Sequence, residues 1–179
     1  MNNRYICRGK RKDNGEWVGG YLYITHNGEY EIKKYDEVSN IEGMTYEVTP
    51  ETVGQLTGLE DKNGKLIYEG DIIKYITRDN FLCTAIVKFG KYVHDGSGGE
   101  YIGPVCLGFY ADVIKVVKID FDEYKKRNPF TEYKTLKLDD EFVTYDDFDP
   151  EWFGDYRNQE SIVFIIPDCE VIGNIHDNR

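Results

Sequence analysis

The sequence predicts a mainly β protein, and three observations lead to this fold class. Short runs of β-branched and aromatic residues recur along the chain, and clusters of Gly, Asn and Asp separate them, a pattern typical of strands joined by tight turns. Tyrosine, which suits half-buried strands, occurs 15 times. The chain has 18 glycines and few alanines, which favours turns and strands over helices. We expect two units: a β-rich N-terminal domain over residues 1–60, and a β-barrel domain over residues 61–179 with an insertion at about 120–160.

The first unit has the pattern of a small antiparallel sheet. RYICRG (4–9), WVGGYLYI (17–24) and EYEIKKY (29–35) have strand composition, and the Asn-Gly steps between them favour hairpin turns. In the second of these strands, alternation predicts the core-facing residues Val18, Gly20, Leu22 and Ile24. The opposite face then carries Trp17, Gly19, Tyr21 and Tyr23. Further on, we expect Thr49 to cap a short helical turn with Pro50 at its first position.

The second unit begins with strongly marked turns. Asp61-Lys62-Asn63-Gly64 predicts a hairpin between LTGL and KLIY, and Gly70-Asp71 releases the chain into IIKYIT. An apolar pair after Gly-Asp often opens the first strand of small SH3-like barrels. Strands are also expected at Phe81–Phe89, at Val113–Ile119, in the apolar run SIVFII, and in EVIGNI near the end. Short strands at this spacing predict a closed barrel or a sandwich.

The segment 120–160 differs from the rest of the chain. It carries −7 of the total net charge of −11, and aromatic residues are interleaved with its acids. We interpret it as a long insertion between barrel strands that packs in part, because disordered acidic tails usually lack aromatics. Aromatic anchors ringed by charge are typical of interfaces. The candidate protein-binding residues are therefore Phe148, Trp152, Phe153 and Tyr156.

The sequence offers no pattern of catalytic, cofactor or metal chemistry. The glycine-rich stretch 94–103 lacks the Lys-Ser or Lys-Thr of a phosphate-binding loop, and we interpret it as a mobile connection between two strands. The acidic cluster that starts at Asp147 fails the Ca²⁺-loop pattern, because Trp152 and Asn158 occupy its sixth and twelfth positions. No zinc-binding histidine spacing and no nucleophile elbow is present. Catalytic residues, cofactors and metals are accordingly all expected to be none.

The net charge and the cysteines indicate which classes of partner and which cellular compartment to expect. A net charge of −11 and a pI of about 4.8 disfavour a broad nucleic-acid-binding role. The sequence has one basic cluster, which we interpret as a solvated strand edge: Arg4, Arg8, Lys10, Arg11 and Lys12. The cysteines are far apart and are expected to be buried free thiols: Cys7, Cys83, Cys106 and Cys169. With no signal peptide or membrane-spanning run, we expect a cytoplasmic protein.

Three stretches together resemble one family. They are RGKRKDNGEWVGGYL, VTPETVGQLTGLEDKNGKLIYEGDII and EVIGNIHDN, and this combination is similar to the YopX family of bacteriophage and prophage proteins. The resemblance implies a small N-terminal β-containing domain, an SH3-like barrel, and a phage or prophage gene expressed inside a bacterium. It carries no established activity. We interpret the motif residues as structural: Gly54, Gln55, Gly58, Asp61, Asn63, Gly64, Glu69, Gly70, Asp71, Gly173 and Asn174.

Three function classes follow. The first is a non-enzymatic accessory protein that binds a protein partner or assembles with itself as a homo-oligomer. The second is a nucleic-acid module that uses Arg4, Arg8, Lys10 and Arg11 with Trp17 or Tyr21 for stacking, or a DNA mimic that uses its acidic face. The third is an enzyme of unrecognised type. The first class is the hypothesis that the sequence favours.

Overall fold

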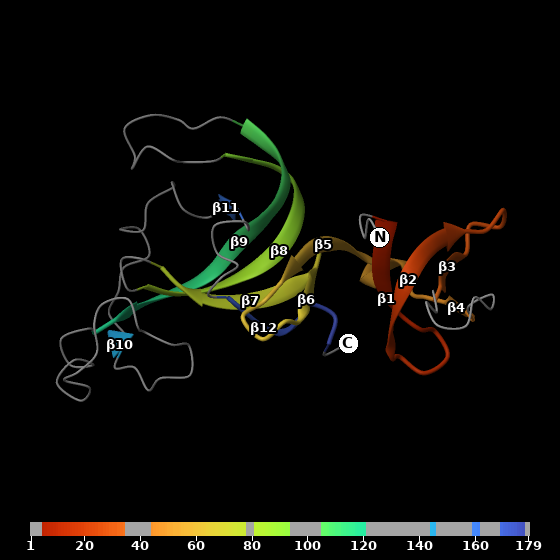
Figure 1. Cartoon of the computed structure of the whole chain (residues 1–179), viewed down its shortest axis with the longest axis horizontal. Coiled ribbons are helices and arrows are strands. Elements are labelled where there is room, and N and C mark those ends of the chain that lie inside the picture. Colours follow the sequence, from red (N-terminus) through yellow and green to blue (C-terminus); the bar gives the residue numbers. More distant parts are fainter. Residues whose placement is uncertain are drawn as a thin grey trace.

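The computed structural model describes residues 5–34, 44–77, 81–93, 105–120, 144–145, 159–161 and 169–177. Their regular structure is almost all strand, arranged as two antiparallel sheets with one short 3-10 turn and no α-helix in this part of the chain. In Figure 1 the strands of the first sheet run from red to yellow, and those of the second run from yellow through green to blue. The mainly β prediction is therefore confirmed.

The first sheet is six-stranded, with the order β4-β3-β2-β1-β5-β6. Its strands are β1 (Ile6–Lys10), β2 (Trp17–Ile24), β3 (Tyr30–Lys33), β4 (Thr45–Glu47), β5 (Gly54–Glu60) and β6 (Leu66–Tyr68). The predicted boundary between units at residue 60 falls at the turn between β5 and β6, and these two strands pair with each other. The boundary itself stays a prediction.

The core of the first sheet is small. Val18, Ile32 and Val48 are fully or almost fully buried and form one cluster. Of the residues predicted to face the core from β2, Val18 and Gly20 are buried and Leu22 is half-buried. Ile24 lies at the strand end and is exposed. Gly20 permits the close approach of β3, because a Cβ there would lie 2.3 Å from the carbonyl oxygen of Lys33.

The turn after β4 corrects one prediction. A 3-10 helix spans Pro50–Thr52 with Pro50 at its start, but the Thr49 side chain makes no capping hydrogen bond. The side-chain hydrogen bonds of this turn come from Thr52 instead. Its hydroxyl donates to the Thr49 carbonyl oxygen and accepts from the Lys10 backbone N–H. The short turn was predicted from Pro50, whereas Lys10 arrives from β1 and could not be seen locally.

The second sheet has the order β10-β9-β8-β7-β12, and β11 also pairs with β9. Its strands are β7 (Asp71–Ile76), β8 (Phe81–Val93), β9 (Val105–Ile119), β10 (Thr144–Tyr145), β11 (Gln159–Ser161) and β12 (Glu170–Asn174). Strands β8 and β9 form a long curved ribbon (Figure 1). The predicted strands at Phe81–Phe89 and Val113–Ile119 are both present and both longer than expected.

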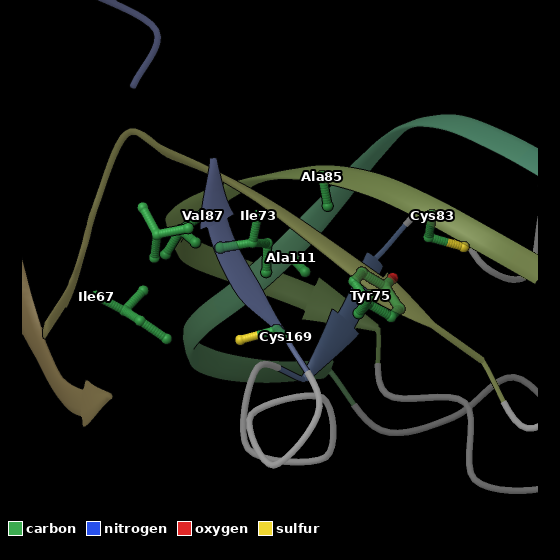
Figure 2. Packing of buried hydrophobic residues seen from close by; sticks show 9 residues of the cluster. Ile67, Ile73, Tyr75, Cys83, Ala85, Val87, Ala111 and Cys169 are labelled. Carbon is green, nitrogen blue, oxygen red and sulfur yellow. The ribbon is translucent and has the colours of Figure 1, made fainter. Parts of the chain in front are cut away.

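The second core is the larger one. Residues from β6, β7, β8, β9 and β12 gather there, and Figure 2 shows most of them in one group: Ile67, Ile73, Tyr75, Cys83, Ala85, Val87, Ala111, Cys169 and Val171. Strand β6 thus pairs within the first sheet while Ile67 packs in the core of the second. The β5–β6 hairpin therefore connects the two sheets.

The second sheet is open among the described residues: their pairings leave β12 at one edge and do not return to β9 or β10. Closure into an SH3-like barrel stays a prediction. Most of the acidic insertion, the glycine-rich stretch 94–103 and most of SIVFII lie outside the described residues. The four cysteines form no disulfide, and all of them lie in the described residues; Cys83 and Cys169 are buried as expected, but Cys7 and Cys106 are only half-buried. Within the part of the chain that the structure describes, no helix has the length and apolar character of a membrane span.

Candidate functional site

A cluster of polar contacts joins the two sheets. Arg8 on β1 forms an ion pair with Asp71 at the start of β7, and both side chains are largely withdrawn from solvent. The guanidinium carbon of Arg8 lies 4.6 Å from the ring centroid of Trp17 and 4.5 Å from that of Tyr68. Close contact of a planar guanidinium with aromatic rings is favourable for arginine in particular.

The Asp71 carboxylate is the centre of this cluster. It is 1% exposed, and it accepts hydrogen bonds from Arg8, from the Tyr68 backbone N–H at 2.8 Å and from the Asn174 side-chain amide at 3.3 Å. A buried carboxylate needs a counter-charge and several donors, because its desolvation costs several kcal/mol. Asp71 therefore links β1, β6 and the end of β12 at one point.

The C-terminal turn extends the same cluster. After β12, the Ile175 N–H donates to the Gly70 carbonyl oxygen at 3.0 Å, which fixes the turn on the second sheet. The Asp177 carboxylate then accepts from the Trp17 indole N–H at 3.0 Å and lies 4.0 Å from the Lys10 ammonium. Lys10 also donates to the His176 carbonyl oxygen. We call Arg8, Lys10, Trp17, Asp71, Asn174 and Asp177 the polar clasp.

The electrostatics of Asp177 reflect these contacts. Partial burial raises the pKa of its carboxyl group, but the opposing effects are together larger. They come from the Trp17 indole N–H, the Asn174 backbone N–H and the positive charges of Lys10 and Arg8. The pKa of Asp177 therefore lies below its ordinary value of 3.8.

A second aspartate, Asp61, organises the hairpin that the sequence predicted. One of its carboxylate oxygens accepts from the backbone N–H groups of Asn63 and Lys65, and the other accepts from Val171 on β12. Burial raises the pKa of Asp61, but these three N–H donors and the nearby Lys65 charge lower it further, so that it lies below its ordinary value. The side chain thus closes its own turn and also holds the last strand.

Other motif residues serve backbone geometry. Gly70 and Gly64 have φ values of 83° and 78°, a region that other residues adopt at a cost. A Cβ on Gly54 would lie 2.3 Å from the Glu69 carbonyl oxygen, so only glycine permits this approach. The Glu69 N–H in turn donates to the Gln55 carbonyl oxygen. The remaining two motif glycines, Gly58 and Gly173, lie beside irregularities in strand register.

The basic cluster corrects another expectation. Strand β1 lies between β2 and β5, so it is not an edge, and the side chains of Arg8 and Lys10 are only 13% and 16% exposed. Arg11 pairs with Asp13, and Lys12 pairs with Glu47. A solvated edge was therefore the wrong interpretation for Arg8 and Lys10, whereas Lys12 is exposed as expected. Arg4 lies outside the described residues.

A second feature is an apolar surface on the β8–β9 ribbon. The side of β8 that buries Cys83, Ala85 and Val87 continues beyond the core as Phe89, Lys91 and Val93, since alternate residues share a face. Register places Phe109, Leu107 and Val105 of β9 directly opposite these three. Exposure is 48% at Phe89, 68% at Val105 and 71% at Leu107. We call Phe89, Val93, Val105, Leu107 and Phe109 the apolar strip.

The other side of the same ribbon is sealed by tyrosines. The rings of Tyr92 and Tyr110 stack with centroids 5.4 Å apart. A Cβ on Gly90 would lie 3.7 Å from the Tyr110 ring, and one on Gly108 would lie 3.9 Å from the Tyr92 ring. Aromatic rings that cover strand glycines in this way restore the packing that a missing side chain loses. The ribbon is therefore an ordered support for the apolar strip.

The predicted interface residues Phe148, Trp152, Phe153 and Tyr156 lie outside the described residues. Among the residues that the structure does describe, no group of three or more His, Cys, Asp or Glu side chains is placed to hold a metal ion. Sequence reasoning missed Lys10, Trp17 and Asp177 as partners, because they are joined across most of the chain. It also missed the strip, although the alternation of Phe89 with Val87 indicated that the core face continues.

The fold and this arrangement define a two-sheet β protein with a polar joint between the sheets. Comparison with known families places the chain more closely: the family model described as YopX protein matches residues 7–118, which is more than half of the sequence. The chain belongs to the YopX family. No curated protein matches it.

Proposed function

We propose that this chain is a non-enzymatic accessory protein of phage or prophage origin, which works in the bacterial cytoplasm by protein contact, first of all with further copies of itself. The observation that carries the proposal is the apolar strip. Its large apolar side chains are exposed on the β8–β9 ribbon. Contiguous exposed apolar surface of this kind is typical of interaction sites.

A second copy of the chain is the occupant that we assign to the strip. Two-fold contacts bring the same patch of each subunit together, and an apolar strip is complementary to itself in this arrangement. The described charge beside the strip is Lys91, which is exposed on a chain whose net charge is −11. The acidic surface of a second copy complements this lysine. The proposal also includes closure of the second unit into an SH3-like barrel. In it, the aromatic residues of the insertion contribute to the contact surface: Phe148, Trp152, Phe153 and Tyr156.

The nucleic-acid alternative receives less support. The residues that were candidates for phosphate contacts, Arg8, Lys10 and Arg11, already pair with carboxylates or carbonyl oxygens of this chain. Phosphate binding would have to displace these partners. In addition, the side chains of Arg8 and Lys10 are only 13% and 16% exposed. This cost makes the strip the stronger basis for a function.

The test is sedimentation velocity of the full chain over a wide concentration range. We expect concentration-dependent association that persists at high salt, because salt screens charge interactions and leaves apolar contacts intact. Leu107→Ser should weaken association by about tenfold or more, since burial of a leucine side chain contributes about 1.5–3 kcal/mol.

The matched control is Ile114→Ser, which removes a side chain that is 55% exposed on the same strand, outside the strip. This variant should associate like the unaltered chain. A chain that stays monomeric at every concentration and salt would overturn self-assembly, as would equal effects of the two substitutions. If a monomeric chain captured a host protein through Leu107, contact function would stand and the assigned occupant would be wrong.

A further inference from the structure

We propose that the C-terminal turn is a strap that fixes strands β1 to β4 against the second sheet, so that detaching it lets these four strands open while the larger core persists. The proposal concerns conformation and is independent of the apolar strip. It starts from the fact that the region from β1 to Val48 has an apolar cluster of its own, whereas Ile67 of β6 packs in the larger core. Val18, Ile32 and Val48 form the separate cluster, and no member of it belongs to the larger core around Ile73.

Polar contacts join the two sheets in addition to the β5–β6 hairpin that they share. They are the contacts of the clasp: Arg8 with Asp71, Lys10 with the His176 carbonyl oxygen, and Trp17 with Asp177. Polar contacts are directional, and each is lost when its geometry is lost. Loss of these contacts should therefore weaken the attachment of β1 to β4 to the second sheet.

The two halves of the clasp differ in how firmly they are held. The Arg8–Asp71 pair is largely buried, and the rings of Trp17 and Tyr68 both lie close to the guanidinium. The Asp177 side chain is 42% exposed and belongs to the turn that follows β12. Exposed turns open at little cost compared with core strands. Opening is therefore expected to begin at Asp177 and to free Trp17 and Lys10 first.

The turn is nevertheless well formed on its own side. Its backbone closes through Asp177 N–H to the Asn174 carbonyl oxygen at 3.0 Å and through Asn174 N–H to the Asp177 carboxylate at 2.7 Å. The His176 N–H donates to the Asn174 side-chain oxygen at 3.0 Å. These bonds keep the turn attached to β12 whether or not it contacts β1 and β2. The strap can thus leave the first sheet without unfolding.

Hydrogen exchange of the full chain, read by mass spectrometry, tests the proposal. Trp17→Phe removes the indole donor and leaves the Asp177 turn bonds untouched. We expect exchange in peptides from β1 to β3 to accelerate by about tenfold, the factor that corresponds to about 1.4 kcal/mol. Exchange in peptides from β7 to β9 should stay unchanged. Lys10→Met should act in the same direction, and the two substitutions together should exceed either one.

The control is Asp13→Ala, which breaks an ion pair with Arg11 on the first sheet outside the clasp. It should leave exchange in β1 to β3 within twofold of the unaltered chain. Equal acceleration in both sheets after Trp17→Phe would mean that they open together, and the strap would be refuted. An unchanged pattern in Trp17→Phe and in Lys10→Met would refute it as well.

Discussion

The two sheets use different means to stay folded. The second has strands of 13 and 15 residues and a core of nine buried residues, eight from five strands and Cys169 immediately before β12. The first has short strands and a buried cluster of three residues, and its glycines bring the backbones close. The comparison shows how a chain can stabilise a small sheet beside a large one. A hairpin is shared between them, and a few polar groups complete the attachment.

The largest expected effect comes from the second core. Ile73→Ala should lower the free energy of unfolding by about 4 kcal/mol, because a deeply buried isoleucine leaves a cavity that its neighbours do not fill. Ile32→Ala makes the same chemical change at a residue that is also 0% exposed, but in the smaller cluster. There the surroundings relax more easily, and we expect about 2–3 kcal/mol. Urea unfolding followed by far-ultraviolet circular dichroism measures both. A larger cost for Ile32→Ala would reverse the comparison.

The next effect concerns the buried half of the clasp. Asp71→Ala should lower the free energy of unfolding by about 3 kcal/mol, because it leaves the Arg8 charge without its counter-charge. The control is Asp112→Ala, which breaks a more exposed pair with Lys88 and should cost at most about 1 kcal/mol. Replacing both partners, as in Arg8→Met with Asp71→Leu, should recover part of the loss. If this double variant were less stable than Asp71→Ala, the proposed role of the uncompensated charge would be wrong.

The smallest effect is a pH dependence at the strap. Because the pKa of Asp177 is lower in the folded chain than its ordinary value of 3.8, its contacts contribute stability above that value. This contribution is lost as the pH falls from about 3.8 through the lower folded pKa. Asp177→Asn should therefore show a flatter decline of stability in acid than the unaltered chain. Chemical unfolding between pH 5 and about pH 2 measures this difference. Identical pH profiles would contradict it.

Local signals in the sequence were enough for the elements themselves. Turn residues such as Asn63 and Gly64 placed the β5–β6 hairpin correctly, and alternation placed Val18 and Gly20 on the buried face of β2. These features depend on backbone preferences within a few residues. YopX membership, which the resemblance indicated, is likewise confirmed.

The joint between the sheets could not be derived in the same way. Trp17 and Asp177 are 160 positions apart, and nothing near either residue specifies the other. The basic cluster was misjudged for the same reason: whether Arg8 is solvated depends on β5 and β6, which cover it from elsewhere in the chain. Thr49 had a good capping context, but its neighbour Thr52 was better placed to meet the Lys10 N–H. In each case the burial or hydrogen bonding of a residue depends on a contact with a distant part of the sequence.

The position of the C-terminal turn has a practical consequence for attaching labels or fusion partners to the protein. Lys10 at the end of β1 donates to the His176 carbonyl oxygen, and the Trp17 indole donates to Asp177, so the turn lies directly beside β1 and β2. A bulky group attached at this turn would compete with both contacts. A label on the exposed turn at Gly28, between β2 and β3, would leave them intact.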